Sequence, residues 1–424
     1  MRSFFQEFEK DDDGSIIRCK MHDIVHDVAQ YLSKNECYMI EVKDFGEQNI
    51  YALCEKALQL RLIVTGNNTI PISICNFKKL RSLLIECDSY AGSKLSSKVV
   101  TKLCDELSCL KALAIVGNSG LHGPFKHIPK EIGRLVHLSN LKELPQGIGK
   151  LINLRHLINI DTYSLSYMPK GIERLTCFRT LTEFHSHGDV YGGKACPLEC
   201  LNNFRHLESI AINMNWSDLK IGCRLIIVTM NDEAILETFQ PSQNLQRLEI
   251  VYYKGFTMSS LRRMTSLTNL RSIKLYHCKK CLHLPPLGKL PSLETLVIER
   301  MYSVREVGNE FLGVESGEAS SSSSSIIYFP NLKTLHFDSM REWEVWDFGN
   351  EDDTCTIMPS LRSLQIQFCH KLKGLPKQLL HQMAPLQNLE IRHCSILEEV
   401  YEKGKGDKWQ DISHIPNIKI WSWR

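Results

Sequence analysis

The chain has 424 residues and a formal net charge of +3, a charge too small to favour nucleic-acid binding through bulk electrostatics. Its 16 cysteines are scattered without the spacing of a secreted disulfide framework, and the first ten residues are polar where a signal peptide would be apolar. No apolar run of about 18 residues is present, so no membrane span is expected. These features predict a reduced, soluble, cytoplasmic protein, with the nucleus or the membrane periphery as further locations.

Residues 1–60 carry no repeat and are predicted to form a small α+β module. Three phenylalanines on one side of residues 2–9 indicate a short amphipathic helix. Residues 15–21 alternate as a strand does. Aliphatic residues at every fourth position then predict a helix that is capped by Asp23 and ends at about Ser33.

A phrase of the form Leu-x-x-Leu-x-Ile, or a close variant of it, recurs along the rest of the chain, mostly at intervals of 23 to 30 residues. The copies begin at Leu80, Leu110, Leu245, Leu270, Leu293, Leu332, Leu361 and Leu386. This is the signature of a leucine-rich repeat. We expect each copy to be a short parallel strand whose aliphatic residues point inward, on the concave side of a curved α/β solenoid.

Three features modify the regular repeat. Cys278, Cys369 and Cys394 follow their strands where the repeat takes Asn or Cys, and a small buried side chain is expected there because the chain turns out of the strand. A loop at about residues 314–327 is Ser-rich and should be disordered. Only 16 residues separate Leu138 from Leu154, which predicts a local defect in the stacking.

Met21-His22-Asp23, placed just before this array, resembles the Met-His-Asp motif of plant nucleotide-binding leucine-rich-repeat immune receptors of the coiled-coil type. That motif closes the winged-helix subdomain of the family. Similar segments are found at residues 2–6, 27–30, 128–132 and 144–148. The resemblance covers essentially the whole chain. It implies a partial winged-helix module at residues 1–60 and a leucine-rich-repeat domain at residues 61–424.

By this resemblance, His22 would lie against the β-phosphate of bound ADP and help hold the inactive state. Asp23 would hold the loop and cap the next helix. The chain contains no G-x-x-x-x-G-K-[ST] loop to cradle the phosphates. It therefore looks like the C-terminal portion of such a receptor. ADP or ATP would belong to the parent receptor, and we expect no nucleotide to be bound by this chain alone.

Two other motifs suggest a metal or redox site, and each also has a purely structural interpretation. His22-Asp-Ile-Val-His26 is a variant of the H-E-x-x-H zinc-protease helix, but Asp is shorter than the required Glu and no third ligand is evident. Cys278-Lys-Lys-Cys281, with histidines on both sides, suggests zinc or redox chemistry, yet the inward repeat position already explains Cys278. The segment 196–200, with a cysteine at each end, is equally weak. We predict no metal site and no enzyme activity.

The residues beside the inward leucines are the candidates for a partner-binding surface, because solenoids bind through concave strands and adjoining loops. They are Arg271, Lys274, Tyr276, Glu294, Glu299, Lys333, His336, Asp338, Arg362, Gln365, Gln367, Glu390 and Arg392. Trp343, Trp346 and Phe348 could be exposed anchors, but core packing is the preferred interpretation.

The sequence thus favours an intracellular plant immune receptor, or part of one, whose repeats bind a pathogen effector or a guarded host protein. In the full receptor the repeats would also contact the nucleotide-binding domain. A stand-alone substrate adaptor of a ubiquitin ligase would need an F-box-like N-terminal module. An extracellular repeat receptor would need a leader and paired capping cysteines. Neither pattern is visible, and no nucleic-acid partner is expected.

Overall fold

The structure is a computed structural model. It describes residues 4–10, 16–33, 36–42, 56–64, 70–87, 97–117, 144–159, 165, 167–185, 193–214, 232–314, 326–349, 355–376 and 386–421. The chain divides into two compact units, Met1–Leu207 and Glu208–Arg424. Each unit is built around its own set of parallel strands.

The first unit begins with an antiparallel hairpin of β1 (Phe5–Lys10) and β2 (Ile16–Met21), followed by α1 (Asp23–Ser33). The strand β2 and both ends of α1 agree with the sequence prediction. The predicted helix at residues 2–9 is wrong, because that segment forms β1. Pairing with β2 supplies the backbone hydrogen bonds of β1, and Glu7 and Lys20 form an ion pair at 3.6 Å across the hairpin.

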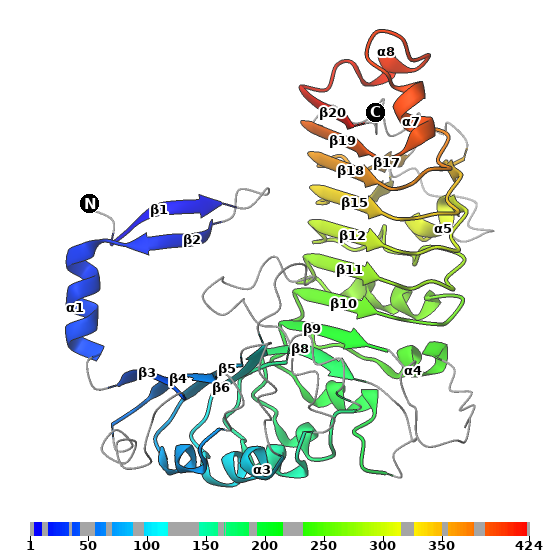
Figure 1. The fold of residues 1–424 in the computed structure, drawn as a ribbon. Coiled ribbons are helices and arrows are strands. Elements are labelled where there is room, and N and C mark those ends of the chain that lie inside the picture. The colour runs from blue at the N-terminus through cyan, green and yellow to red at the C-terminus, as the bar shows by residue number, and fades with distance from the viewer. Residues whose placement is uncertain are drawn as a thin grey trace. The chain divides into compact units, whose positions relative to one another are not determined.

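Parallel strands follow in chain order in the first unit, each paired with the next (Figure 1). They are β3 (Cys37–Glu41), β4 (Gln59–Val64), β5 (Ser82–Cys87), β6 (Ala112–Gly117), β7 (His156–Ile158) and β8 (Thr180–His185). The helical segments between them are η1 (Ile72–Asn76), α3 (Ser97–Glu106), η2 (Gln146–Lys150), η3 (Ile172–Arg174) and η5 (Leu198–Asn203). The parallel pairing thus starts at Cys37, among the residues that the sequence analysis places in the N-terminal module.

The second unit repeats the same strand-and-return pattern with greater regularity. Its main strands are β9 (Ser209–Asn213), β10 (Arg247–Val251), β11 (Ser272–Tyr276), β12 (Thr295–Glu299), β15 (Thr334–Asp338), β18 (Ser363–Gln367), β19 (Asn388–Arg392) and β20 (Asn417–Trp421). Neighbouring strands pair in parallel without a register shift. The return segments include α4 (Asp232–Thr238), η6 (Ser259–Ser266), α5 (Asn309–Leu312), α7 (Ser395–Val400) and α8 (Trp409–Ile412).

Return segments also pair with one another in the second unit. Strand β13 (Glu306–Val307) pairs with β16 (Val345–Trp346), and β14 (Ile326–Tyr328) pairs with β17 (Cys355–Ile357), in two small parallel sheets. Residues 326 and 327, which the sequence analysis includes in a disordered loop, are therefore part of a strand. Residues 315–325 of that loop and residues 138–143 of the compressed segment lie outside the described residues, whereas residues 144–154 of the compressed segment are described and include η2.

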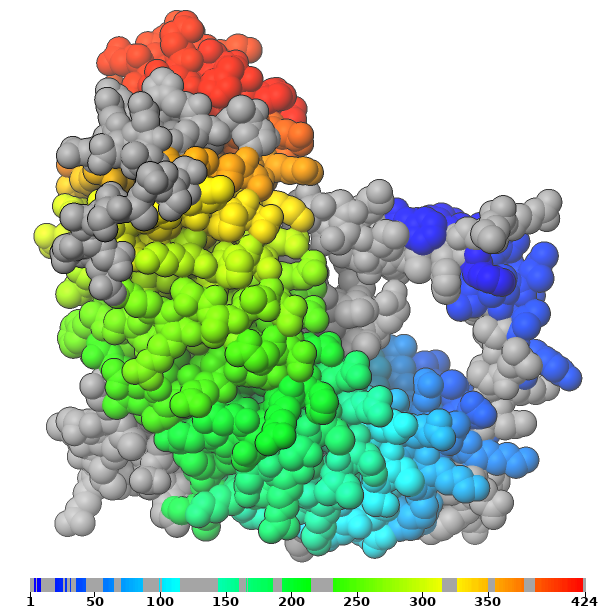
Figure 2. Space-filling view, turned by 180° about the vertical axis from the view of Figure 1, so that it is seen from behind, coloured from blue at the N-terminus to red at the C-terminus, as the bar shows by residue number. Residues whose placement is uncertain are grey.

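The core of the second unit is formed by the inward residues that the repeat phrase predicts. From Leu245 to Ile391, the three aliphatic or aromatic positions of every copy are 2% exposed or less. Stacked repeats appear as successive bands of colour from green to red in the space-filling view (Figure 2). Each repeat buries its apolar edge only against its neighbours, which is how a solenoid builds a continuous core.

Candidate protein-binding surface

The open side of the second unit's sheet is formed by columns of residues that the strand register aligns. The central column comprises Lys274, Val297, His336, Gln365 and Glu390. The end column comprises Tyr276, Glu299, Asp338, Gln367 and Arg392. In β11 through β18 these residues are partly exposed while the alternating positions are buried, so one face of the sheet is polar and accessible.

The structure places nine of the thirteen predicted partner-binding residues in these two columns. The other four, Arg271, Glu294, Lys333 and Arg362, immediately precede their strands. Their backbones are linked from repeat to repeat, since the N–H of Glu294 donates to the carbonyl of Arg271 at 2.8 Å and that of Lys333 donates to Glu294 at 2.8 Å. The predicted residues therefore form one continuous surface.

Ion pairs cross between the repeats on this surface. Glu294 accepts from Arg271 at 3.1 Å and from Lys333 at 2.8 Å, so one carboxylate is bracketed by two cations. Lys274 and Glu299 form a less exposed pair at 3.1 Å. Such surface pairs contribute little to stability individually. Their effect is to neutralise charge on this part of the face.

Six strands of the second unit, β10, β11, β12, β15, β18 and β19, are each followed directly by a residue with left-handed backbone geometry, and we call this set the turn column. Its members, with φ between 53° and 62°, are Tyr252, His277, Arg300, Ser339, Phe368 and His393. The N–H of His277 donates to the carbonyl of Glu299 at 2.9 Å, and Phe368 donates in the same way to Arg392 at 2.9 Å. These bonds extend the ladder by one residue while the chain turns out of the strand, which accounts for a conformation that non-glycine residues rarely adopt.

The side chains of the turn column contact one another across repeats. The rings of Tyr252 and His277 are 4.9 Å apart, and those of Phe368 and His393 are stacked at 4.8 Å. Burial, together with the charges of Lys279 and Arg300, lowers the pKa of His277 from 6.5 to about 4. His277 is therefore neutral at physiological pH.

The cysteine pair at Cys278 and Cys281 is buried, with both side chains 0% exposed. The Cys278 thiol faces the carbonyl of Tyr276 at 3.6 Å, and the Cys281 thiol donates to the carbonyl of Gly255 at 3.4 Å. Burial raises the pKa of Cys278 to about 12 and raises that of Cys281 as well. The inward placement predicted for Cys278, Cys369 and Cys394 is confirmed. In the described ranges, no group of three His, Cys, Asp or Glu side chains is placed to hold a metal ion.

The aromatic residues after β15 belong to the core. Trp343, Trp346 and Phe348 are 0%, 4% and 5% exposed. The rings of Trp343 and Trp346 lie 4.7 Å and 5.3 Å from that of Phe337, and Phe348 packs against Trp346 at 6.3 Å. The Trp343 indole N–H donates to the carbonyl of Val345 at 2.9 Å. The preferred interpretation of these residues as core packing is therefore confirmed.

The residues of the Met-His-Asp motif lie at the start of α1. His22 precedes the helix, and its backbone N–H donates to the carbonyl of Phe4 at 3.1 Å. The side chains of His22 and Asp23 are both exposed. The side chain of His26 lies outside what the structure describes.

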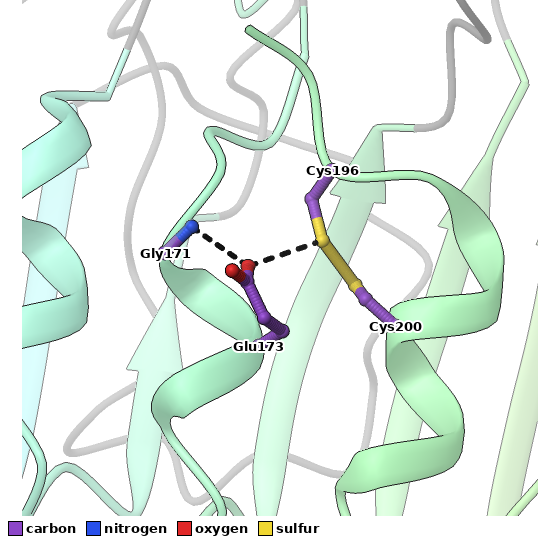
Figure 3. Close-up of a disulfide and its surroundings, with 4 residues drawn as sticks. All are labelled: Gly171, Glu173, Cys196 and Cys200. Carbon is purple, nitrogen blue, oxygen red and sulfur yellow. Dashed lines mark hydrogen bonds between the residues drawn. A yellow bond between two sulfur atoms is a disulfide. The ribbon is translucent and has the colours of Figure 1, made fainter. Parts of the chain in front are cut away.

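Cys196 and Cys200 in the first unit form a disulfide, whereas the sequence analysis expects reduced cysteines (Figure 3). Cys200 lies in the short helix η5 and Cys196 two residues before it, with their Cα atoms 6.5 Å apart. The Glu173 carboxylate accepts from the N–H of Gly171 at 2.7 Å and lies 3.6 Å from the sulfur of Cys196. The spacing of the two cysteines in the sequence did not indicate that they form a disulfide.

Sequence reasoning also missed the turn column as a possible part of the surface. Its members differ in chemistry, so no residue type marks them. Their position could have been found, because each is two residues after the last inward residue of its repeat and directly before the Cys or its equivalent.

The parallel pairing, the buried repeat phrase and the turn after each strand together define a leucine-rich-repeat solenoid protein. Residues 172–301 match the family of R13L1/DRL21 leucine-rich repeats. Residues 242–395 match the leucine-rich repeats of RPS2-like plant disease resistance proteins. Together the two matches cover residues 172–395, where the chain is similar to the leucine-rich repeats of plant disease resistance proteins.

Individual relatives agree with this assignment. A putative disease resistance RPP13-like protein 1 of Arabidopsis thaliana is 29% identical over 170 residues, covering 40% of this chain and 16% of its own length. The probable disease resistance protein RXW24L of the same plant is 23% identical over 437 residues, covering 95% of this chain and 45% of its own length. The chain thus spans less than half of these two relatives.

Among solved structures, the chain resembles the functional domain of InlJ from Listeria monocytogenes. That likeness has 11% identity and a TM-score of 0.39, and it covers 86% of this chain and 72% of the other. No helix in the described ranges is long and apolar enough to cross a membrane.

Proposed function

We propose that the chain is the recognition part of an intracellular plant immune receptor and that its second unit binds a pathogen effector or a guarded host protein. The observation that carries the proposal is the polar, register-aligned face of β11 through β19 on repeats that match those of plant disease resistance proteins. Solenoids bind partners over such extended faces because no single pocket is needed.

A paired-variant screen tests this function. The bait is the full chain, and a second bait carries Lys274→Ala, His336→Ala and Gln365→Ala in the central column. A control bait carries Arg262→Ala, Lys289→Ala and Gln410→Ala, which are exposed residues on return segments. Candidate effector and host proteins are then measured by calorimetry with purified chains.

If the proposal is correct, the partner protein binds the unchanged chain and the control equally. It binds the central-column variant about tenfold or more weakly, since several contacts at the centre of an interface are lost together. Partners that bind the central-column variant as tightly as the unchanged chain would contradict recognition through this face.

We also propose that His22 and Asp23 belong to an ADP/ATP-dependent switch of a longer receptor. The position of His22 directly before an 11-residue helix supports this, because helix N-termini favour phosphate. Titration of ADP into this chain should give no saturable heat. In a chain that also carries a phosphate-binding loop, His22→Ala should weaken ADP retention, and unchanged retention would argue against the switch role.

A further inference from the structure

Three cations in or near the turn column form no ion pair with a carboxylate of the described residues. Lys279, Arg300 and Arg341 are exposed, and none of them forms an ion pair within the part of the chain that the structure describes. Other lysines on return segments of the same unit are paired. Lys371 contacts Glu342 at 2.6 Å and Lys373 contacts Glu344 at 3.0 Å. The positive charge of the three cations is thus left uncompensated.

Aromatic rings hold these cations in place. The Arg300 guanidinium lies 5.3 Å from the Tyr276 ring centre and donates to the Tyr276 hydroxyl at 2.8 Å. Tyr302 lies between two cations, with Lys279 at 5.5 Å and Arg341 at 4.6 Å from its ring centre. Cation–π contacts orient the charged groups but do not neutralise them.

His277 lies near both of the aromatic rings, Tyr276 and Tyr302, that hold these cations. Its ring lies 5.5 Å from that of Tyr276 and 6.1 Å from that of Tyr302. Its pKa is lowered first by burial and then by Lys279 and Arg300, so the neighbouring cations disfavour one more positive charge. The same local potential favours an anion at this place.

We propose that a cation–aromatic patch, formed by Tyr276, His277, Lys279, Arg300, Tyr302 and Arg341, binds a short acidic segment of the partner protein. The inference rests on the proposed function, since the patch adjoins the end column of the strand face. Carboxylates of the partner would accept N–H donors from the two guanidinium groups, and the tyrosine rings would cover its apolar atoms.

A protein segment fits this patch better than a nucleic acid does. Glu299 and Asp338 lie in the end column directly beside Arg300 and the turn that leads to Arg341. Their carboxylates would repel a phosphate backbone that continued along the sheet, because nucleic-acid binding needs a continuous positive track. A short acidic peptide would need only the patch itself.

The test uses the full chain and three fluorescent probes of equal length. They are a peptide of alternating Glu and Tyr, a peptide of alternating Gln and Tyr, and oligothymidine, and binding is followed by fluorescence anisotropy. The patch variant carries Lys279→Gln, Arg300→Gln and Arg341→Gln. The matched control carries Lys371→Gln, Lys373→Gln and Lys405→Gln, which remove the same charge from lysines that are already paired with carboxylates.

The Glu-Tyr peptide should bind the unchanged chain and the control about equally. It should bind the patch variant about tenfold or more weakly, with affinity that falls as salt is added. Tyr302→Ala should weaken binding, whereas Tyr302→Phe should retain it because the ring face remains.

Three results would overturn the inference: equal binding of the Glu-Tyr and Gln-Tyr peptides, equal losses in the patch variant and the control, or tighter binding of oligothymidine than of the acidic peptide. The first two leave no specific acidic site, and the third indicates a nucleic-acid surface. If the peptide fails while central-column variants still lose a protein partner, only this inference falls and the proposed function stands.

Discussion

The backbone N–H of Cys369 donates to the sulfur of Cys394 at 3.3 Å, so one repeat provides an acceptor for the turn of the repeat before it. Both side chains are 0% exposed. A buried N–H without an acceptor is costly, and a dry turn has no water to supply one. This contact gives a physical reason for a small side chain with an acceptor atom at this place in the repeat.

Removing that acceptor should destabilise the second unit. We expect Cys394→Ala to lower the free energy of unfolding by about 1–3 kcal/mol, the cost of leaving a buried donor unsatisfied. Cys394→Asn should recover part of the loss, because the amide oxygen can accept from Cys369. Urea unfolding followed by circular dichroism measures both. Equal stabilities of the alanine and asparagine variants would contradict this role.

The left-handed turn column makes a second stability prediction, best tested at Ser339 because its side chain is small. Its φ is 55°. Ser339→Val should cost about 1–3 kcal/mol, since a β-branched residue is strained in this conformation. Ser339→Gly should cost much less, because glycine adopts it freely. Thermal unfolding compares the stability of the two variants. A valine variant as stable as the glycine variant would contradict strain at this position.

The titration of His277 should differ from that of an ordinary histidine. An NMR titration should give a midpoint near the pKa of about 4, against the usual 6.5. Between these values the unfolded chain binds more protons than the folded chain, so stability falls as the pH is lowered from about 6.5 to about 4. The patch variant that lacks Lys279 and Arg300 should raise the midpoint part of the way towards 6.5. A midpoint already at 6.5 in the unchanged chain would refute the assignment.

Burial predicts losses of stability of very different size for two substitutions near the start of β15. Leu335 is 0% exposed, and Leu335→Ala should lower stability by about 2–5 kcal/mol through lost burial and a cavity. Lys333 is exposed two residues earlier and pairs with Glu294, so Lys333→Ala should cost no more than about 1 kcal/mol. Chemical denaturation compares them directly. Similar losses for both would contradict the burial of Leu335 and the exposure of Lys333.

The repeat phrase was sufficient to predict β10, β11, β12, β15, β18 and β19, because the same spacing places the same three positions inward in every copy. It did not predict β9 or β20, which no copy of the phrase in our sequence analysis covers. The helix at Asp23–Ser33 was predictable for a similar reason, since one aliphatic stripe fixes its length. The first strand was not predictable from its own residues. Local spacing indicates a helix there, but pairing with β2 decides the structure.

The candidate surface was predicted only where it follows the strands. The patch depends on contacts such as that of Arg300 with Tyr276, which join residues 24 apart through the stacking of repeats. The disulfide joins Cys200 in η5 to Cys196 just before that helix, and the sequence pattern did not predict where η5 begins. Such contacts follow from the exact stacking, which the sequence pattern does not give.

Recognition through the open face of β11 through β19 is tested most directly by hydroxyl-radical footprinting of the chain with and without a bound partner. Oxidation of Tyr276 and His336 should fall in the complex, while that of Trp409 on α8 should stay the same. Protection of Trp409 with unchanged oxidation of Tyr276 and His336 would contradict recognition through the strand face.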